Sequence, residues 1–275
     1  MFKNEKLIRL ALEEDIGPGD VTTEALIEPD RVARAVFVAK ESLVLAGLQV
    51  AREVFATLDP AMSFETSFQD GDRAGSEDEI LTAYGKLQAL LTGERTALNF
   101  VQRLSGIATL TRQYVDRVAG SNVRLTDTRK TIPGWRRLEK YAVKIGGAYN
   151  HRFGLYDGIL IKDNHIVACG GISEAVAGVR NNRPHLLRIE VEVSDINQVK
   201  EALENGVDII MLDNMDLNDI HEAVRLVDGR ALVEVSGGVT LDTLPEIANT
   251  GVDIISIGAL THSARAVDIS MRVVV

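Results

Sequence analysis

The chain has 275 residues, 45% of them hydrophobic and 25% charged, as in an ordinary soluble globular protein. Its formal net charge of −10 argues against a protein that coats nucleic acid or an anionic membrane. A single cysteine, Cys169, excludes an intrachain disulfide and a cysteine-rich metal site. The start of the chain is charged throughout, and no apolar run reaches the roughly 20 residues of a membrane helix. We therefore expect a cytoplasmic protein with no nucleic-acid or membrane partner.

The first hundred residues predict a separate α+β domain. Segments 32–47 and 63–74 alternate apolar and polar residues in the manner of antiparallel strands. Segments 47–58 and 86–118 have the apolar spacing of amphipathic helices. The second of these predicts a long helix that leads out of the domain.

The second half predicts parallel βα units, because six short apolar, β-branched runs alternate with helical stretches. The runs begin at Val123, Gly158, Leu187, Asp208, Ala231 and Asp253. Asp195 and Gly206 can begin and end one helix, and Thr240 and Gly251 another. Equivalent positions in the last four runs follow one another at 21 to 23 residues, about one βα unit per step. A closed barrel needs eight strands, so the barrel is either incomplete or completed by strands that the pattern does not reveal.

Charged or phosphate-binding residues follow almost every predicted strand. They are 127–130, 162–165, Glu192, Asp213 with Asn214, 236–238 and Gly258. In a (β/α) barrel these positions meet at one mouth. Residues 124–162 contain nine Lys or Arg and three acids, a net charge of +6 inside an acidic chain, which indicates an anion site. For Arg137, Lys140 and Lys144 a solvated helix face is an equal alternative.

Two further groups of residues at this mouth suggest a metal site and a phosphate site. Glu192 and Asp213 end consecutive strands and suit Mg²⁺ that is shared with substrate phosphates, the alternative being salt bridges to nearby lysines. Ser236, Gly237 and Gly258 end the last two strands, where exposed backbone N–H groups commonly bind phosphate. Tight turns that need small residues are the alternative there.

One forty-residue string, DTRKTIPGWRRLEKYAVKIGGAYNHRFGLYDGILIKDNHI, closely resembles the quinolinate phosphoribosyltransferase family. The resemblance extends to EEDIGPGDVTT, LLTGERTALNFVQRLSGIAT, EVEVSD, DIIMLDNM and VEVSGGV, and so covers nearly the whole chain. It implies an α/β sandwich domain at 1–108, with the tail at about 265–275 as a candidate addition, and an open, incomplete α/β barrel at 109–264. It also implies a homodimer with active sites shared between subunits, and leaves a hexamer open.

The activity that the resemblance implies is the joining of quinolinate to phosphoribosyl pyrophosphate (PRPP). Pyrophosphate and carbon dioxide are released, and nicotinate mononucleotide is formed for NAD biosynthesis. Mg²⁺ is the implied cofactor, held by Glu192 and Asp213 directly, through water or through substrate.

The resemblance also assigns roles residue by residue. Quinolinate is held by Arg95, Arg129, His151 and Arg152, with Arg95 entering the neighbouring subunit's site. The catalytic residues are Lys130, Lys162, Glu192 and Asp213. The PRPP phosphates are bound by Lys130, Lys162, Ser236, Gly237, Gly238, Gly258 and His262. Two residues depart from the family pattern: Ala148, where glycine is common, and Trp135, where an aliphatic residue is common.

Three alternatives remain. A same-fold paralogue of the molybdenum-operon type would use a different anionic substrate, but it would not need all four quinolinate-binding residues. A nicotinate phosphoribosyltransferase needs fewer cations for carboxylates. A non-catalytic anion- or nucleotide-binding protein would not need an acid pair and lysines at one mouth.

Overall fold

The computed structural model describes residues 4–182 and 184–274, which form two compact units. The first unit contains the described residues up to Leu110, the segment Pro133–Gly146 and the described residues from Ala264 onwards. The second, the barrel unit, contains Thr111–Ile132 and Gly147–Ser263. The division therefore groups Pro133–Gly146 with the first unit, whereas the expected domains place that segment in the barrel.

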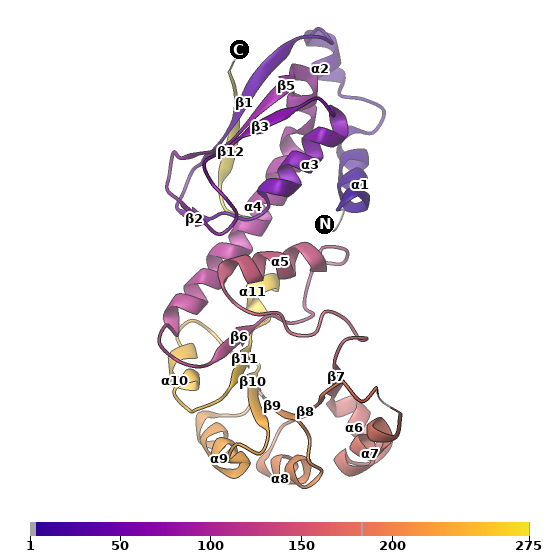
Figure 1. Cartoon of the computed structure of the whole chain (residues 1–275), viewed down its shortest axis with the longest axis vertical. Coiled ribbons are helices and arrows are strands. Elements are labelled where there is room, and N and C mark those ends of the chain that lie inside the picture. Colours follow the sequence, from indigo (N-terminus) through magenta and orange to yellow (C-terminus); the bar gives the residue numbers. More distant parts are fainter. Residues whose placement is uncertain (1–3, 183, 275) are drawn as a thin grey trace. The chain divides into compact units, whose positions relative to one another are not determined.

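The first unit is built on an antiparallel sheet of four strands (Figure 1). In sheet order these are β12 (Ile269–Val274), β1 (Val32–Ala39), β5 (Glu79–Lys86) and β3 (Ser63–Glu65). The last five residues of β1 are all buried, so both faces of the central strand are covered. Two short strands, β2 (Leu43–Val44) and β4 (Arg73–Ala74), form a separate antiparallel pair. The predicted α+β domain is confirmed.

Helices complete the first unit. They are α1 (Glu5–Ile16), α2 (Val21–Leu26), α3 (Leu48–Leu58), α5 (Arg136–Gly146) and most of α4 (Leu87–Arg117). The side chain of Asp20 caps α2 by accepting from the N–H of Thr23 at 3.0 Å. Trp135 stacks on Phe100 with ring centroids 4.6 Å apart. This contact gives the unusual aromatic residue at 135 a packing role.

The barrel unit holds six parallel strands, as the sequence predicts. In sheet order they are β6 (Arg124–Thr126), β11 (Ile254–Ser256), β10 (Leu232–Ser236), β9 (Ile209–Asp213), β8 (Ile189–Val193) and β7 (Ile159–Ile161). Within the described residues β6 and β7 are the two ends of the sheet, so the barrel is open between them. The incomplete barrel is therefore confirmed.

Helices follow the strands of the barrel unit (Figure 1). They are α6 (Asp163–Cys169), α7 (Ile172–Asn182), α8 (Ile196–Glu204), α9 (Leu217–Val227), α10 (Leu244–Ala248) and α11 (Ala259–His262). Asp195 caps α8 by accepting from the N–H groups of Asn197 and Gln198. The helix expected from Thr240 begins only at Leu244, because the side chains of Thr240 and Thr243 hydrogen-bond in a turn. In the described ranges no helix is long and apolar enough to cross a bilayer.

Candidate active site

A cavity of about 710 Å³ lies at the C-terminal ends of the barrel strands. All of its lining residues belong to the barrel unit. They include every predicted site residue except Arg95, namely Arg129, Lys130, His151, Arg152, Lys162, Glu192, Asp213, Ser236, Gly237, Gly238, Gly258 and His262. Residues spread over more than 130 positions of the sequence therefore line one cavity.

Arg95 is the predicted residue that does not line this cavity. It is exposed on α4 in the first unit. Its expected role in the site of a neighbouring subunit stays a prediction.

The acids and the lysine reach the cavity because parallel strands end at the same edge of the sheet. Asp213 and Ser236 are the last residues of β9 and β10 and pair directly across the ladder. Lys162 follows β7 as the N-cap of α6, where its N–H donates to Nδ1 of His165 at 3.0 Å. Its Nζ forms an ion pair with Oε2 of Glu192. A salt bridge between a strand-end acid and a nearby lysine is thus present, as one of the two interpretations of Glu192 expects.

Two arginines supply the positive charge at one side of the cavity. Burial, and then the charge of nearby Arg129, lower the pKa of Arg152 below its ordinary value. The guanidinium of Arg152 is fixed by a hydrogen bond of 3.0 Å to the carbonyl of Gly158. Two cations that repel each other in a partly buried cavity are stabilised by an anion, and planar guanidinium groups match a carboxylate or phosphate.

The loop after β10 can approach its neighbour only because residue 237 is glycine. Asn214 has a positive φ of 55°, and its Nδ2 donates to Oδ2 of Asp213 at 3.0 Å. A Cβ on Gly237, which has φ of 89°, would lie 2.1 Å from Oδ1 of Asn214. Asn214 therefore links the acid at the end of β9 to the glycine turn, a role that the sequence pattern does not indicate.

Gly258 has a similar function after β11. A Cβ there would lie 3.0 Å from Cδ of Lys130 and 3.1 Å from Nε2 of His262. The absence of a side chain lets the lysine stem and the imidazole come close to the backbone at the start of α11. With Gly237 and Gly238 nearby, this part of the cavity has the small residues and cations of a phosphate site.

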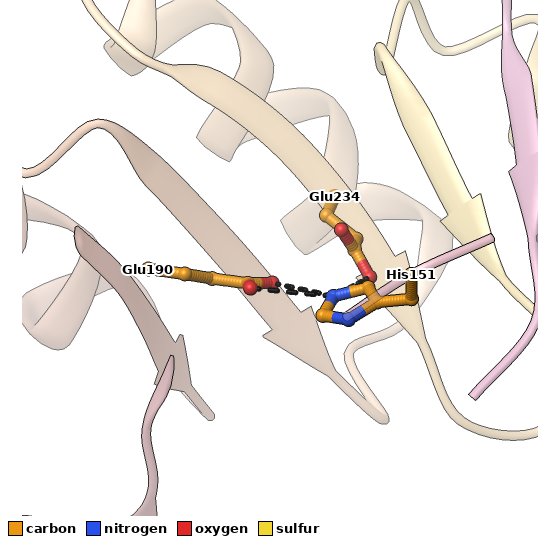
Figure 2. Close-up of side chains that lie close together, drawn as sticks. All are labelled: His151, Glu190 and Glu234. Atoms are coloured by element: carbon orange, nitrogen blue, oxygen red, sulfur yellow. Dashed lines mark hydrogen bonds and ion pairs between the residues drawn. The ribbon is translucent and has the colours of Figure 1, made fainter. Parts of the chain in front are cut away.

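His151 lines the cavity, and its ring faces two buried acids, Glu190 and Glu234 (Figure 2). Its Nε2 is 3.3 Å from Oε2 of Glu190 and 3.5 Å from Oε1 of Glu234. Its Nδ1 accepts from the N–H of Arg152 at 2.8 Å, which assigns the ring proton to Nε2. These three side chains could together hold a metal ion, but a proton on Nε2 occupies the position that a metal would need.

The sequence predicts no role for Glu190 or Glu234, although a signal exists. In EVEV and VEVS each of these acids lies two residues before a strand-end site residue, so both pairs face the barrel interior. Burial, and then the charge of Glu190, raise the pKa of Glu234 to about 7.

Comparisons with known proteins match the chain over nearly its whole length. The family model described as quinolinate phosphoribosyl transferase, N-terminal domain, matches residues 20–105, and that of the C-terminal domain matches residues 107–272. A probable nicotinate-nucleotide pyrophosphorylase [carboxylating] of Bacillus subtilis is 45% identical over 98% of this chain and 93% of its own length. A relative of the same description from Synechocystis is 48% identical over 96% of this chain and 90% of its length. The crystal structure of NadC from Streptococcus pyogenes has a TM-score of 0.94 at 44% identity, covering 98% of this chain and 95% of that one.

Proposed function

The chain belongs to the quinolinate phosphoribosyl transferase family, and we propose that it converts quinolinate and PRPP into nicotinate mononucleotide, pyrophosphate and carbon dioxide. One observation carries the proposal. A single cavity brings together an arginine pair, two lysines, two acids and glycine turns. Quinolinate carries two carboxylates and PRPP carries a phosphate and a pyrophosphate, so both substrates need such an array of cations and backbone donors.

Each substrate has a distinct part of the cavity in this proposal. Arg129 and Arg152 hold the carboxylates of quinolinate, and His151 shapes the wall beside them. Ser236, Gly237, Gly238, Gly258 and His262 surround the 5′-phosphate of PRPP. Lys130 and Lys162 lie at the pyrophosphate and the reacting carbon, where their charge stabilises the departing group.

The reaction then needs little covalent chemistry from the protein. The ring nitrogen of quinolinate attacks the anomeric carbon of PRPP as the bond to pyrophosphate breaks. The nitrogen now carries positive charge, which stabilises the carbanion left when the adjacent carboxylate departs as carbon dioxide. That carbanion takes up one proton from solvent to give the product. The side chains orient the two substrates and balance their charge.

Mg²⁺ is the proposed cofactor, and the donor set fits it. Glu192 and Asp213 offer carboxylate oxygens, the hard ligands that Mg²⁺ prefers, and both line the cavity. When bound, the ion would neutralise charge on the leaving pyrophosphate. Lys162 already engages one oxygen of Glu192, which supports contact to the ion through the other oxygen, through water or through substrate.

We extend the proposal to the assembly and its place in the cell. Arg95 is an exposed cation outside the lining of the cavity, as expected for a residue that serves the site of a partner subunit. The proposed form is therefore a homodimer, acting in the cytoplasm.

Turnover of quinolinate with PRPP and Mg²⁺, following nicotinate mononucleotide and carbon dioxide together, tests the function. Equal amounts of both products are expected, and nicotinate should not replace quinolinate. Turnover of nicotinate without carbon dioxide would contradict the proposal, as would turnover of another anion only. Chelation of Mg²⁺ should abolish the reaction; full activity in chelator would overturn the metal assignment.

A further inference from the structure

Lys130 is anchored on both sides of its backbone. Its N–H donates to Oγ1 of Thr128 at 3.1 Å. Its carbonyl oxygen accepts from Oγ1 of Thr261 at 2.7 Å, across a sequence separation of 131 residues. Thr261 lies in α11, and no part of it is exposed. A buried hydroxyl that donates its proton to the carbonyl of a distant loop helps to fix the position of that loop.

The hydroxyl proton of Thr261 has one better acceptor. The carbonyl oxygen of Gly258, one turn earlier, is 3.2 Å away, compared with 2.7 Å for that of Lys130. The shorter contact has the ordinary length of an O–H···O hydrogen bond. Thr261 therefore hydrogen-bonds mainly to the loop after β6 rather than to its own helix.

The sheet explains why two distant segments meet here. β6 and β11 are neighbours and pair in parallel, with Thr126 beside Ser256. The N–H of Ile257 continues this pairing by donating to the carbonyl of Thr126 at 2.9 Å. The segments that follow the two strands consequently run side by side. Lys130 comes from one of them, and Thr261 comes from the other.

The side chain of Lys130 is constrained as well as its backbone. Its Cδ would lie 3.0 Å from a Cβ on Gly258, so the aliphatic stem rests against the first residue of the α11 turn. Lys130 lines the cavity with its carbonyl anchored by Thr261 and its stem against Gly258, so both its backbone and its side chain are constrained there.

We propose that Thr261 is a positioning residue that holds Lys130 where its ammonium meets the pyrophosphate of PRPP. The inference rests on the proposed function and deepens it. Thr261 itself does not line the cavity, so it acts only through Lys130. Loss of the hydroxyl lets the lysine loop move, and a displacement of about 1 Å is enough to reduce catalysis by roughly 100-fold.

Thr261→Val is the appropriate change because valine keeps the shape and removes the donor. Thr261→Ser keeps the donor and should restore function. Thr250→Val is the matched control: Oγ1 of Thr250 also donates to a backbone carbonyl, that of Ile247, at 2.7 Å, and the residue is also buried. Thr250 precedes β11 and Thr261 follows it, so the control lies at the opposite end of the strand from the cavity.

Steady-state kinetics with varied PRPP separate the two threonines. In Thr261→Val we expect kcat/KM for PRPP to fall by about 10- to 100-fold, while Thr261→Ser stays within about threefold of the unchanged protein. Both valine variants should lower the melting temperature to a similar extent, because each loses one buried hydrogen bond. Thr250→Val should leave kcat/KM nearly unchanged. Equal kinetics in the two valine variants would overturn the proposal, as would failure of serine to restore activity.

A double-mutant cycle tests whether the effect passes through Lys130. In a Lys130→Ala background, Thr261→Val should lower kcat/KM for PRPP little further, because the ammonium group that Thr261 positions is already absent. A full, additive loss would overturn the inference.

Calorimetric binding of PRPP keeps this result distinct from the proposed function. If the unchanged protein binds PRPP without turning over quinolinate, the proposed function fails. Weaker PRPP binding by Thr261→Val than by Thr250→Val would then still support the inference. If the unchanged protein turns over quinolinate and both valine variants match it in turnover and in PRPP binding, the inference fails alone. If the unchanged protein neither turns over quinolinate nor binds PRPP, both fail.

Discussion

Nε2 of His151 and Oε1 of Glu234 face each other in the interior of the barrel, 3.5 Å apart (Figure 2). Glu234 is only 1% exposed, and the carboxyl group of Glu190 raises its pKa further beyond the effect of burial. An interior carboxyl group that keeps its proton near neutral pH links the stability of the barrel to pH.

Glu234→Gln should remove part of this pH dependence. The pKa of Glu234 rises from an ordinary 4.5 to about 7 on folding, so between these values the folded state binds more protons than the unfolded state. The free energy of unfolding therefore falls as pH rises through this window and levels off above it. The free energy of unfolding of Glu234→Gln should lack this fall. As the pH rises from 5 to 8, the variant should therefore gain about 1–3 kcal/mol in free energy of unfolding relative to the unchanged protein.

Urea unfolding at a series of pH values measures this difference. Glu204→Gln, at an exposed position on α8, is the control, and its curve should run parallel to that of the unchanged protein. A Glu234→Gln curve that also runs parallel would show that Glu234 is not protonated in this window.

Arg129→Ala should weaken quinolinate binding without unfolding the protein. Loss of a charge-assisted hydrogen bond corresponds to about 1.5–3 kcal/mol, so KM for quinolinate should rise by roughly 10- to 100-fold. KM for PRPP should change much less. Arg225→Ala removes an exposed arginine from α9 and should leave both constants unchanged. Unaltered quinolinate kinetics in Arg129→Ala would exclude this arginine from the clamp.

Gly237→Ala should lose activity by a steric route. The new Cβ would lie 2.1 Å from Oδ1 of Asn214, and the positive φ of 89° disfavours any side chain. We expect Asn214 to move, Asp213 to lose its hydrogen bond, and kcat/KM for PRPP to fall by at least about tenfold.

Gly170→Ala isolates the backbone contribution to that loss. Gly170 has φ of 93°, and a Cβ there would meet nothing within 4 Å. Its alanine variant should therefore be destabilised by about 1–2 kcal/mol and keep its kinetics. Equal kinetic losses in the two alanine variants would count against the contact between Gly237 and Asn214.

Mixed dimers test whether Arg95 serves a partner subunit. Arg95→Ala and Lys162→Ala chains should each be inactive alone, because each lacks a cation of the proposed site. In a heterodimer one of the two sites receives both intact residues, so activity should reappear at up to about half of the normal value per dimer. Verified heterodimers with no activity would contradict a shared site.

The sequence by itself determined the six barrel strands, their order along the chain and the residues that follow them. These features depend on periodicity within short segments, because a parallel strand between helices has a recognisable local pattern. The residue that follows such a strand lies at the mouth of the barrel, whichever strands pair beside it. The α+β unit is predictable for the same reason. Periodicity left open whether the six strands form an incomplete barrel, and the family resemblance implied the open form.

Only the tertiary structure decided which distant groups touch. The contact of Thr261 with Lys130 depends on β11 lying beside β6, and the requirement for glycine at 237 depends on the conformation of Asn214 across the ladder. The buried group of His151, Glu190 and Glu234 similarly depends on two strands facing the same interior. Periodicity within one segment does not specify the strand order and register of its neighbours, and these relations between segments position the residues that shape the cavity.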